Sequence, residues 1–219
     1  MHLLQPVWFL SLFLACFCSN YTGIPERKVE FCEKQSQDPY FDIELLVGKK
    51  WRVYYTWNMI FDSKCYDTVF KKPNKETILR IRSDMKDYLL HQPRWSTAAL
   101  HVITRVGSSE HELLMFPDQG PAGRFLAVPN VVRAPGSIEM KIQTIKHRET
   151  LQLLKIFIKL VANGKYLLVM DCVMRGASLS AHAQPYRAEV ATQAAALQVE
   201  GPSYPACTRE KHKNEMVAT

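Results

Sequence analysis

The residues of this 219-residue chain that could do chemistry are few and widely spaced. Ser109, Glu110 and His111 stand side by side, and they are the residue types of a nucleophile, an acid and a base. A catalytic triad needs three side chains that converge, whereas neighbours along a strand point to opposite faces. The chain also lacks the Gly-x-Ser-x-Gly, His-Glu-x-x-His and phosphate-loop motifs. We therefore expect a protein that is not an enzyme.

The six cysteines fall into two groups. Two lie in an apolar N-terminal segment, and no two of the other four stand within four residues of each other, a spacing that does not fit a zinc site. An even number of cysteines in an exported chain predicts two disulfides, and four cysteines allow three pairings. The four are Cys32, Cys65, Cys172 and Cys207.

The N-terminal segment has the character of an export signal. Residues 3–18, LLQPVWFLSLFLACFC, carry no charge and are mostly apolar, but the run is short for a membrane span. We assign residues 1–19 to a secretory signal peptide; the alternative is an N-terminal membrane anchor. The longest later apolar run, LQLLKIFIKLV, is interrupted by lysines. We therefore expect no membrane span and a secreted, extracellular protein.

Composition and charge narrow the class of partner. The chain is 47% hydrophobic and 22% charged, as an ordinary globular protein is, and its length suits one domain. The formal net charge is +7, but the lysines and arginines form no block of five or six. We therefore expect no nucleic-acid partner, while an affinity for acidic partners stays open.

From Lys50 onward, most runs alternate apolar and polar residues, as strands with one buried face do. The clearest runs are WRVYYTW, SIEMKIQTIKH and LQLLKIFIKLV, and Asn163-Gly164 predicts a tight turn after the last of these. CYDTVFKK and ETILRIRS flank PNK, which is typical of a hairpin. Repeated strands joined by short turns predict a sandwich or a barrel. Further short runs in residues 84–136 leave the strands there unassigned.

One segment departs from this pattern. Residues 186–201, YRAEVATQAAALQVEG, are rich in alanine and lie between Pro185 and Pro202, so we expect a helix at about 187–199. In this interpretation, residues 20–44 form an irregular N-terminal arm and residues 209–219 a C-terminal tail.

Several of these features resemble the lipocalin family. Gly48 stands three residues before Trp51 at the start of a strand, and Cys172 follows Tyr166 by six residues. The spacing of the first pair is similar to that of the divergent triabin- and nitrophorin-like lipocalins of blood-feeding arthropods. The resemblance implies an all-β fold: an eight-stranded antiparallel up-and-down barrel with one C-terminal α-helix, over residues 45–208. The arginine that lipocalins carry on the last strand has no clear equivalent in SAHAQPYR.

The resemblance also implies roles for single residues. In the family the first cysteine pairs with the third and the second with the fourth, which gives Cys32–Cys172 and Cys65–Cys207. Trp51 would close one end of the barrel. Haem-binding relatives use a histidine as the axial ligand, and His101, in the strand-like run AALHVITRV, is the candidate here. The alternative for His101 is an ordinary surface or rim histidine. We expect no other cofactor and no metal.

An eight-stranded barrel is wide enough to hold one small ligand. The expected inward positions are apolar or aromatic, which favours a hydrophobic ligand, because an uncompensated amine would be costly to bury there. An amine carrier should have an acidic residue facing inward; we assign none, although Asp67 and Glu112 remain open. The expected cavity lining is Val53, Tyr55, Trp57, Leu79, Ile81, Ile138, Met140, Ile142, Ile156 and Ile158.

Two functions from different classes follow. The first is a monomeric, secreted carrier of a small hydrophobic molecule. In the alternative the same side chains fill the barrel, and the protein acts through its surface, as a triabin-like inhibitor that binds a protease or another host protein. The apolar inward positions favour the first function, and the basic charge favours the second.

Overall fold

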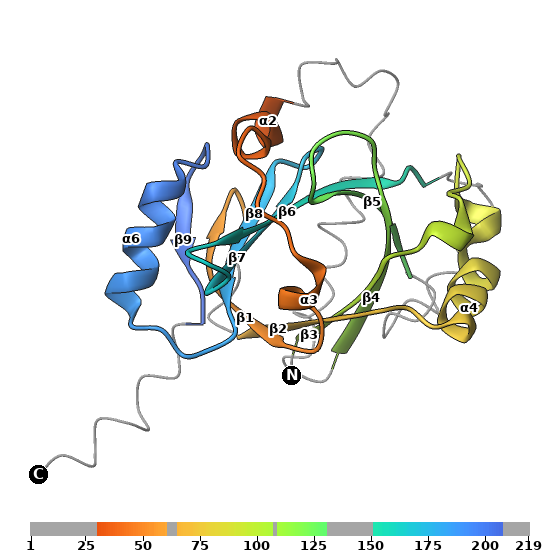
Figure 1. The fold of residues 1–219 in the computed structure, drawn as a ribbon, viewed down its shortest axis with the longest axis horizontal. Helices are drawn as coiled ribbons and strands as arrows, with labels where there is room; N and C mark the ends of the chain where they lie inside the picture. Colours follow the sequence, from red (N-terminus) through yellow and green to blue (C-terminus); the bar gives the residue numbers. More distant parts are fainter. Residues whose placement is uncertain (1–29, 61–64, 107–108, 131–150, 208–219) are drawn as a thin grey trace, which may run out of the picture.

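The computed structural model describes residues 30–60, 65–106, 109–130 and 151–207. Each of eight antiparallel strands pairs with the next, and β1 also pairs with β8, so the sheet closes into a barrel (Figure 1). This confirms the expected eight-stranded barrel with a C-terminal helix, and the fold is lipocalin-like. The strands are β1 Lys50–Trp57, β2 Tyr66–Lys71, β3 Leu100–Val106, β4 Ser109–Pro117, β5 Arg124–Pro129, β6 Leu154–Val161, β7 Tyr166–Asp171 and β8 Gly176–Ala181.

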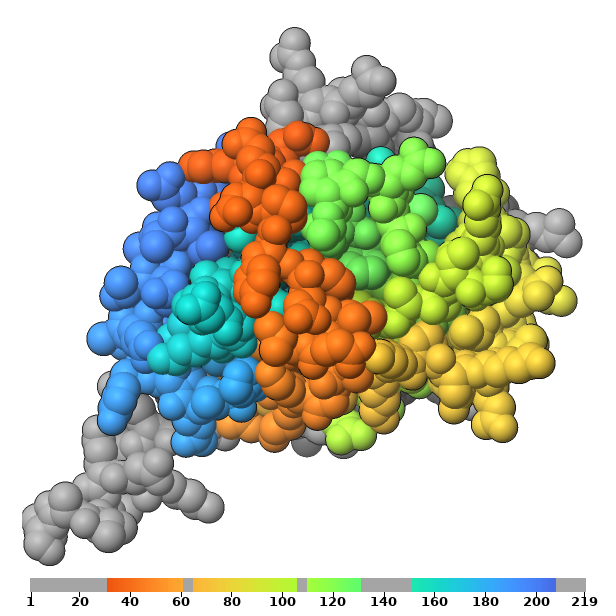
Figure 2. Space-filling view, in the orientation of Figure 1, coloured from red at the N-terminus to blue at the C-terminus, as the bar shows by residue number. Residues whose placement is uncertain are grey.

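The segment before β1 packs on the outside of the barrel near the end of β7 and then covers the end of the barrel at which Trp51 lies. It contains two short helices, α2 (Glu30–Ser36) and α3 (Ile43–Leu46), and Figure 2 shows it in orange-red across the middle of one molecular face. The indole N–H of Trp51 donates to the Leu46 carbonyl at 3.2 Å, and both side chains are fully buried. Gly48 turns the chain into β1 with a φ of +80°, a conformation that favours glycine.

Apolar side chains fill the inside of the barrel near Trp51. Every strand from β1 to β7 contributes at least one of them, and each fully buried side chain of this size stabilises the fold by roughly 1.5–3 kcal/mol. The buried members of this inner cluster are Leu46, Trp51, Phe70, Leu100, Val102, Met115, Phe125, Ala127, Leu154, Ile156, Ile158, Leu160 and Leu167.

Two helices cover the outside of the barrel on opposite sides (Figure 1). Helix α6 (Arg187–Leu197) follows the last strand of the barrel, within the range of about 187–199 that its alanine-rich sequence predicts. It packs on β1, and its Val190 and Ala194 are buried in a cluster that also contains Trp57, Leu168 and Leu179. Helix α4 (Lys75–Met85) lies between β2 and β3 and packs on outward-facing residues of β4 and β5.

Helix α4 overturns the expected strand at ETILRIRS, and with it the hairpin around PNK. The Asn74 side chain accepts a hydrogen bond from the Thr77 N–H at 2.8 Å, which is a typical helix N-cap. Ile81 and Met85 are four residues apart and lie on the buried face, whereas Leu79 is 52% exposed. The alternation of Leu79 and Ile81 therefore belongs to a helix, and neither residue lies on a barrel strand.

A second correction concerns β1, where Trp51, Val53, Tyr55 and Trp57 were expected on one face. The register with β8 shifts between Val53 and Tyr55, so the strand contains a β-bulge. Beyond the bulge, Tyr55 and Trp57 pair with Leu179 and Ala177, which belong to the cluster beneath α6. They face outward, and Thr56 takes the inward place.

The remaining predicted segments have mixed outcomes. Residues 84–136 contain β3, β4 and β5. The segment LLHQPRW in the same range forms no strand: it begins directly after the 3₁₀ helix Lys86–Tyr88 and ends at the start of the 3₁₀ helix Trp95–Thr97. The turn predicted at Asn163-Gly164 is confirmed: the Lys165 N–H donates to the Ala162 carbonyl at 3.2 Å. The predicted strand SIEMKIQTIKH lies outside the described residues.

Both expected disulfides are present. Cys32 of α2 is bonded to Cys172 at the end of β7, and Cys65 before β2 is bonded to Cys207. Cys207 follows a short ninth strand, β9 (Ser203–Pro205), which pairs with the second half of β1. Each bridge thus attaches a flanking segment to the barrel. Within the described residues, no helix is long and apolar enough to span a membrane.

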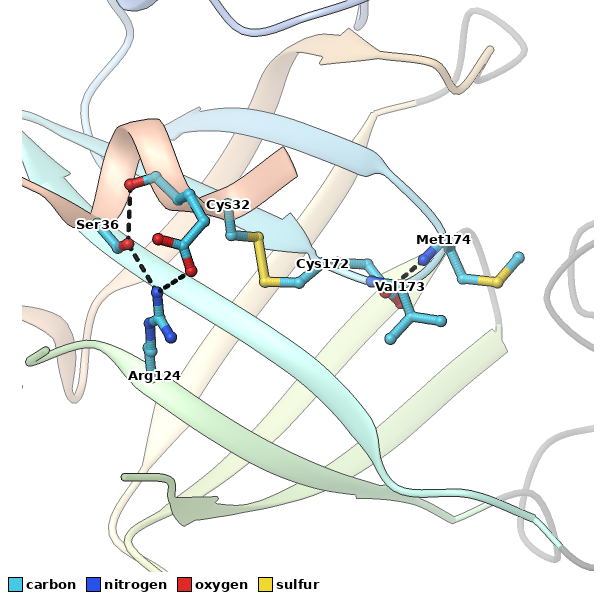
Figure 3. Close-up of a disulfide and its surroundings, with 8 residues drawn as sticks. Cys32, Ser36, Arg124, Cys172, Val173 and Met174 are labelled. Carbon is cyan, nitrogen blue, oxygen red and sulfur yellow. Dashed lines mark hydrogen bonds and ion pairs between the residues drawn. A yellow bond between two sulfur atoms is a disulfide. The ribbon is translucent and has the colours of Figure 1, made fainter. Parts of the chain in front are cut away.

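Helix α2 has a further attachment to the barrel, shown in Figure 3. The Arg124 guanidinium of β5 donates to the Ser36 hydroxyl at 2.8 Å and to the Glu33 carboxylate at 3.2 Å. The Ser36 hydroxyl donates in turn to the Glu33 carbonyl at 2.9 Å. Together with the Cys32–Cys172 bond, these contacts hold the arm against the strands.

Candidate ligand-binding site

The strand register shows which side chains face the inside of the barrel. Residues paired across an antiparallel ladder point to the same side of the sheet. Trp51 faces inward and lies in register with Thr68, which pairs with Thr104, which in turn pairs with His111. These three polar residues therefore face inward as well. We call the end of the barrel away from Trp51 the mouth.

Several inward-facing side chains toward the mouth are only half-buried, although others, such as Thr56 and Asp171, are buried. Beneath the two helices, outward residues such as Leu114, Val128, Leu168 and Leu179 are fully buried. In a closed barrel with a filled interior, the inward-facing side chains should be fully buried. The half-buried inward-facing side chains therefore indicate that solvent reaches part of the inner wall. The half-buried inward residues are Thr68, Thr104, His111, Leu113, Pro129, Val169 and Ser178.

Among the described residues, this part of the inner wall carries one carboxylate. Asp171, the last residue of β7, pairs with Ile156 of β6, a member of the inner cluster. It also continues the inward alternation of Leu167 and Val169, whereas Met170 packs beneath α6. Asp171 therefore faces inward, near the mouth.

One oxygen of Asp171 is used by the turn that follows. Its Oδ1 accepts hydrogen bonds from the N–H groups of Val173 and Met174, both at 2.9 Å; these residues lie beside the disulfide in Figure 3. Its Oδ2 has no hydrogen-bond partner among the described residues, and the residue is only 7% exposed. Burial raises the pKa of Asp171, although the two backbone hydrogen bonds oppose that shift.

The side chain of Met59 packs on Gly176, the strand partner of Asp171. Gly176 of β8 pairs with Asp171, so a Cβ on Gly176 would point inward, and it would come within 2.7 Å of the Met59 sulfur. The missing side chain at position 176 therefore makes room for Met59 on the inner wall. A methionine is a flexible neighbour that can adapt to different contents of the barrel.

His111 is a second inward-facing titratable group. Its Nδ1 is buried and has no hydrogen-bond partner within the described part of the chain. Burial lowers the pKa of His111, which favours a neutral imidazole. The wall toward the mouth thus combines an acid, an imidazole and hydroxyl groups with apolar side chains.

The predicted cavity lining divides into three groups. Val53, Ile156 and Ile158 face inward, and the last two belong to the inner cluster. Four residues do not: Tyr55 and Trp57 face α6, and Leu79 and Ile81 lie on α4. The remaining three, Ile138, Met140 and Ile142, lie outside the described residues.

Sequence reasoning missed Thr56, Asp171 and Ser178 as lining residues. Asp171 could have been found by continuing the alternation of Leu167 and Val169 for two more residues. Thr56 could not, because the bulge that turns it inward leaves no mark in the alternating pattern of WRVYYTW.

The acidic residues left open by the sequence both face outward. The Asp67 carboxylate accepts from the Arg52 guanidinium at 2.8 Å and lies 3.1 Å from the Lys50 amine. The Glu112 carboxylate accepts hydrogen bonds from both terminal nitrogens of Arg80, a residue of α4, at 2.8 and 2.9 Å. Neither acid is available to a ligand inside the barrel.

His101 also faces outward. It pairs with Lys71 and Leu114, and its Nε2 lies 3.4 Å from the Glu112 carboxylate beneath α4. It therefore cannot serve as an axial ligand to a haem inside the barrel. Among the residues that the structure describes, no three His, Cys, Asp or Glu side chains form a group that could hold a metal ion.

The motif residues lie at the covered end of the barrel. Tyr166 is fully buried in the cluster beneath α6. His182, directly after β8, places its ring edge-to-face on Trp51 with centroids 5.2 Å apart. Within SAHAQPYR, His182 thus contacts the tryptophan with an imidazole, whereas the family resemblance implies an arginine there.

A cleft of about 220 Å³ lies on the outside, between the start of α6, β1 and β9. Tyr54, Tyr55 and Arg187 line it together with apolar residues, and the neighbouring Tyr186 is 85% exposed. Tyrosine and arginine are common in protein-binding surfaces.

Comparisons of the chain with protein-family models, with curated proteins and with solved structures found no match.

Proposed function

We propose that the protein is a secreted carrier that binds a small, largely apolar molecule inside the barrel. The observation that carries this proposal is the half-buried inner wall toward the mouth, opposite an end that Trp51 and α3 cover. This wall combines apolar side chains, such as Leu113, Pro129 and Val169, with fixed polar groups, as small-molecule sites do. Binding rather than catalysis is part of the proposal, because the sequence carries none of the catalytic motifs sought.

Export and family are further parts of the proposal. Two disulfides are typical of proteins that fold outside the cytosol, and the apolar residues 3–18 have the composition of a signal peptide. The barrel, the pairing of the cysteines and the Gly48–Trp51 spacing together support a triabin- or nitrophorin-like lipocalin.

A fluorescence titration with N-phenyl-1-naphthylamine, an apolar probe, tests the carrier function. Leu113 faces inward and is half-buried, so Leu113→Trp should fill the inner wall and weaken probe binding by at least about tenfold, the effect of roughly 1.4 kcal/mol. Leu79→Trp, on the exposed face of α4, is the matched control and should bind like wild type. Circular dichroism would establish that both variants fold. Equal binding by all three proteins, or none by wild type, would contradict the proposal.

A second candidate is a surface-acting inhibitor, which the tyrosine- and arginine-lined cleft favours. Its partner would be a protease or another host protein in extracellular fluid. A clotting-time assay with the purified protein tests this function, and Tyr186→Ala should lower any inhibition. Inhibition that survives in Leu113→Trp but not in Tyr186→Ala would favour the surface over the barrel interior.

A further inference from the structure

The inner wall contains a buried carboxyl group, one oxygen of which has no hydrogen-bond partner among the described residues. Asp171 faces inward, its Oδ2 is unpaired there, and the residue is 93% buried, the complement of its 7% exposure. A buried carboxylate oxygen without a hydrogen-bond donor is costly, so natural structures rarely leave one without a compensating group.

Neighbouring side chains on the strands do not supply that group. None of the inward-facing strand residues within the described ranges is a lysine or arginine. The nearest inward positions are Ile156 and Gly176, which pair with Asp171, and Ser178, which follows on β8. A serine hydroxyl can donate a hydrogen bond, but it carries no charge.

The turn after β7 accounts for only one of the two oxygens of the Asp171 carboxylate. An asparagine would satisfy the N–H groups of Val173 and Met174 equally well, because one carbonyl oxygen accepts both. The charge and the second oxygen of Asp171 thus remain without a role in the turn. Met59, flexible and packed on the inner side of Gly176, is a neighbour that could give way to a bound group.

From this placement we propose that Asp171 binds the protonated amine of a small ligand whose apolar body lies along the inner wall. The inference rests on the proposed carrier function and names its ligand class: an aliphatic or aromatic primary amine. An ammonium group donates up to three hydrogen bonds and would offset both the unpaired Oδ2 and its charge. His111, with its unpaired Nδ1, offers an uncharged acceptor on the same inner wall.

Calorimetric titration of the full mature chain with octylamine and octan-1-ol tests this proposal. The two probes have the same chain length and differ in whether the head group is charged. Wild type should bind the amine at least about tenfold more tightly than the alcohol, because a hydrogen bond to a charged group contributes more than a neutral one. Asp171→Asn retains the acceptor for the turn and should abolish that preference while leaving the affinity for the alcohol within about twofold. Asp38→Asn, which removes an exposed carboxylate, should retain the preference.

The outcomes separate this inference from the carrier function. Equal affinity of wild type for both probes, or an amine preference that survives in Asp171→Asn, would overturn the inference and leave the carrier function standing. Binding of neither probe, together with no uptake of N-phenyl-1-naphthylamine, would overturn both. The comparison of the two probes in wild type needs no variant, so equal affinities would overturn the inference even if Asp171→Asn fails to fold.

Discussion

Trp51 joins the covered end of the barrel to its inner cluster. Its indole donates to Leu46, its ring meets His182 edge-to-face, and the side chain is fully buried. Removing so large a buried ring leaves a cavity that its neighbours fill only in part.

Trp51→Ala should therefore lower the free energy of unfolding by roughly 3–5 kcal/mol. Urea unfolding followed by circular dichroism measures the change. Tyr186→Ala is the control, because that side chain is 85% exposed and its loss should change stability by no more than about 0.5 kcal/mol. Similar losses in the two variants would refute the structural role assigned to Trp51.

A cluster of polar side chains beneath α4 makes the free energy of unfolding depend on pH. The cluster consists of Arg80, His101, Glu112 and Asn130. Burial lowers the pKa of His101, against the pull of Glu112, so the imidazole stays neutral in the folded protein. Burial alone would raise the pKa of Glu112, but hydrogen bonds from Arg80 and Asn130 prevail and lower it. In both cases the unfolded chain binds protons more readily than the folded protein does.

Stability should consequently fall as the pH is lowered from neutral, first through the usual titration range of histidine, about 6.5, and then through that of glutamate. His101→Gln removes the contribution of His101 and should make the melting temperature less dependent on pH between about pH 7 and pH 5. His111, whose pKa burial also lowers, should retain part of that dependence. His91→Gln, at an exposed position, is the control. A pH dependence that is unchanged in His101→Gln would show that His101 is not its source.

At the scale of elements, α4 is held in place by its first turn and its buried face. Asn74 caps the helix through the Thr77 N–H, and Ile81 and Met85 pack on the barrel. Asn74→Ala should destabilise the protein by about 0.5–2 kcal/mol, the usual effect of losing such a cap. Ser83→Ala, exposed on the same helix, should have little effect. Thermal unfolding compares the two, and equal midpoints would contradict the capping role.

The same helix shows where sequence patterns are ambiguous. In ETILRIRS, Leu79 and Ile81 alternate as in a strand, while Ile78 and Ile81 have helical spacing, and eight residues are too few to decide. The pattern of β6 was unambiguous, because Leu154, Ile156, Ile158 and Leu160 alternate over a whole strand and all four lie in the inner cluster. The bulge in β1 could not be predicted from the sequence. It turns Tyr55 and Trp57 outward and places Thr56 on the inner wall instead.

For the whole molecule, the strand patterns predicted a sandwich or a barrel and the cysteine count predicted two disulfides. The resemblance to lipocalins implied the closed eight-stranded barrel and the pairing of the cysteines, and the structure has both. The candidate site was harder to predict, because it depends on which side chains of each strand face inward. Asp171 illustrates this: its direction follows from the register of β6, β7 and β8 and not from its own neighbourhood in sequence.

The two disulfides connect residues 140 and 142 positions apart and so bind the flanking segments to the barrel. Replacing Cys32 and Cys172 together by alanine should lower the free energy of unfolding by roughly 2–5 kcal/mol, chiefly because the unfolded chain gains freedom. Guanidinium unfolding of this double variant and of the Cys65/Cys207 pair measures both contributions. Unchanged stability in either variant would contradict a structural role for that bridge.

The central claim is that a small molecule binds inside the barrel. The most direct test is a native mass spectrum of the protein purified from cells of its own source, with Leu113→Trp prepared in the same way. We expect one small molecule bound per chain in wild type and none in the variant. A wild-type spectrum of the bare chain, unchanged after incubation with octylamine, octan-1-ol and N-phenyl-1-naphthylamine, would contradict the claim and direct attention to the outer cleft.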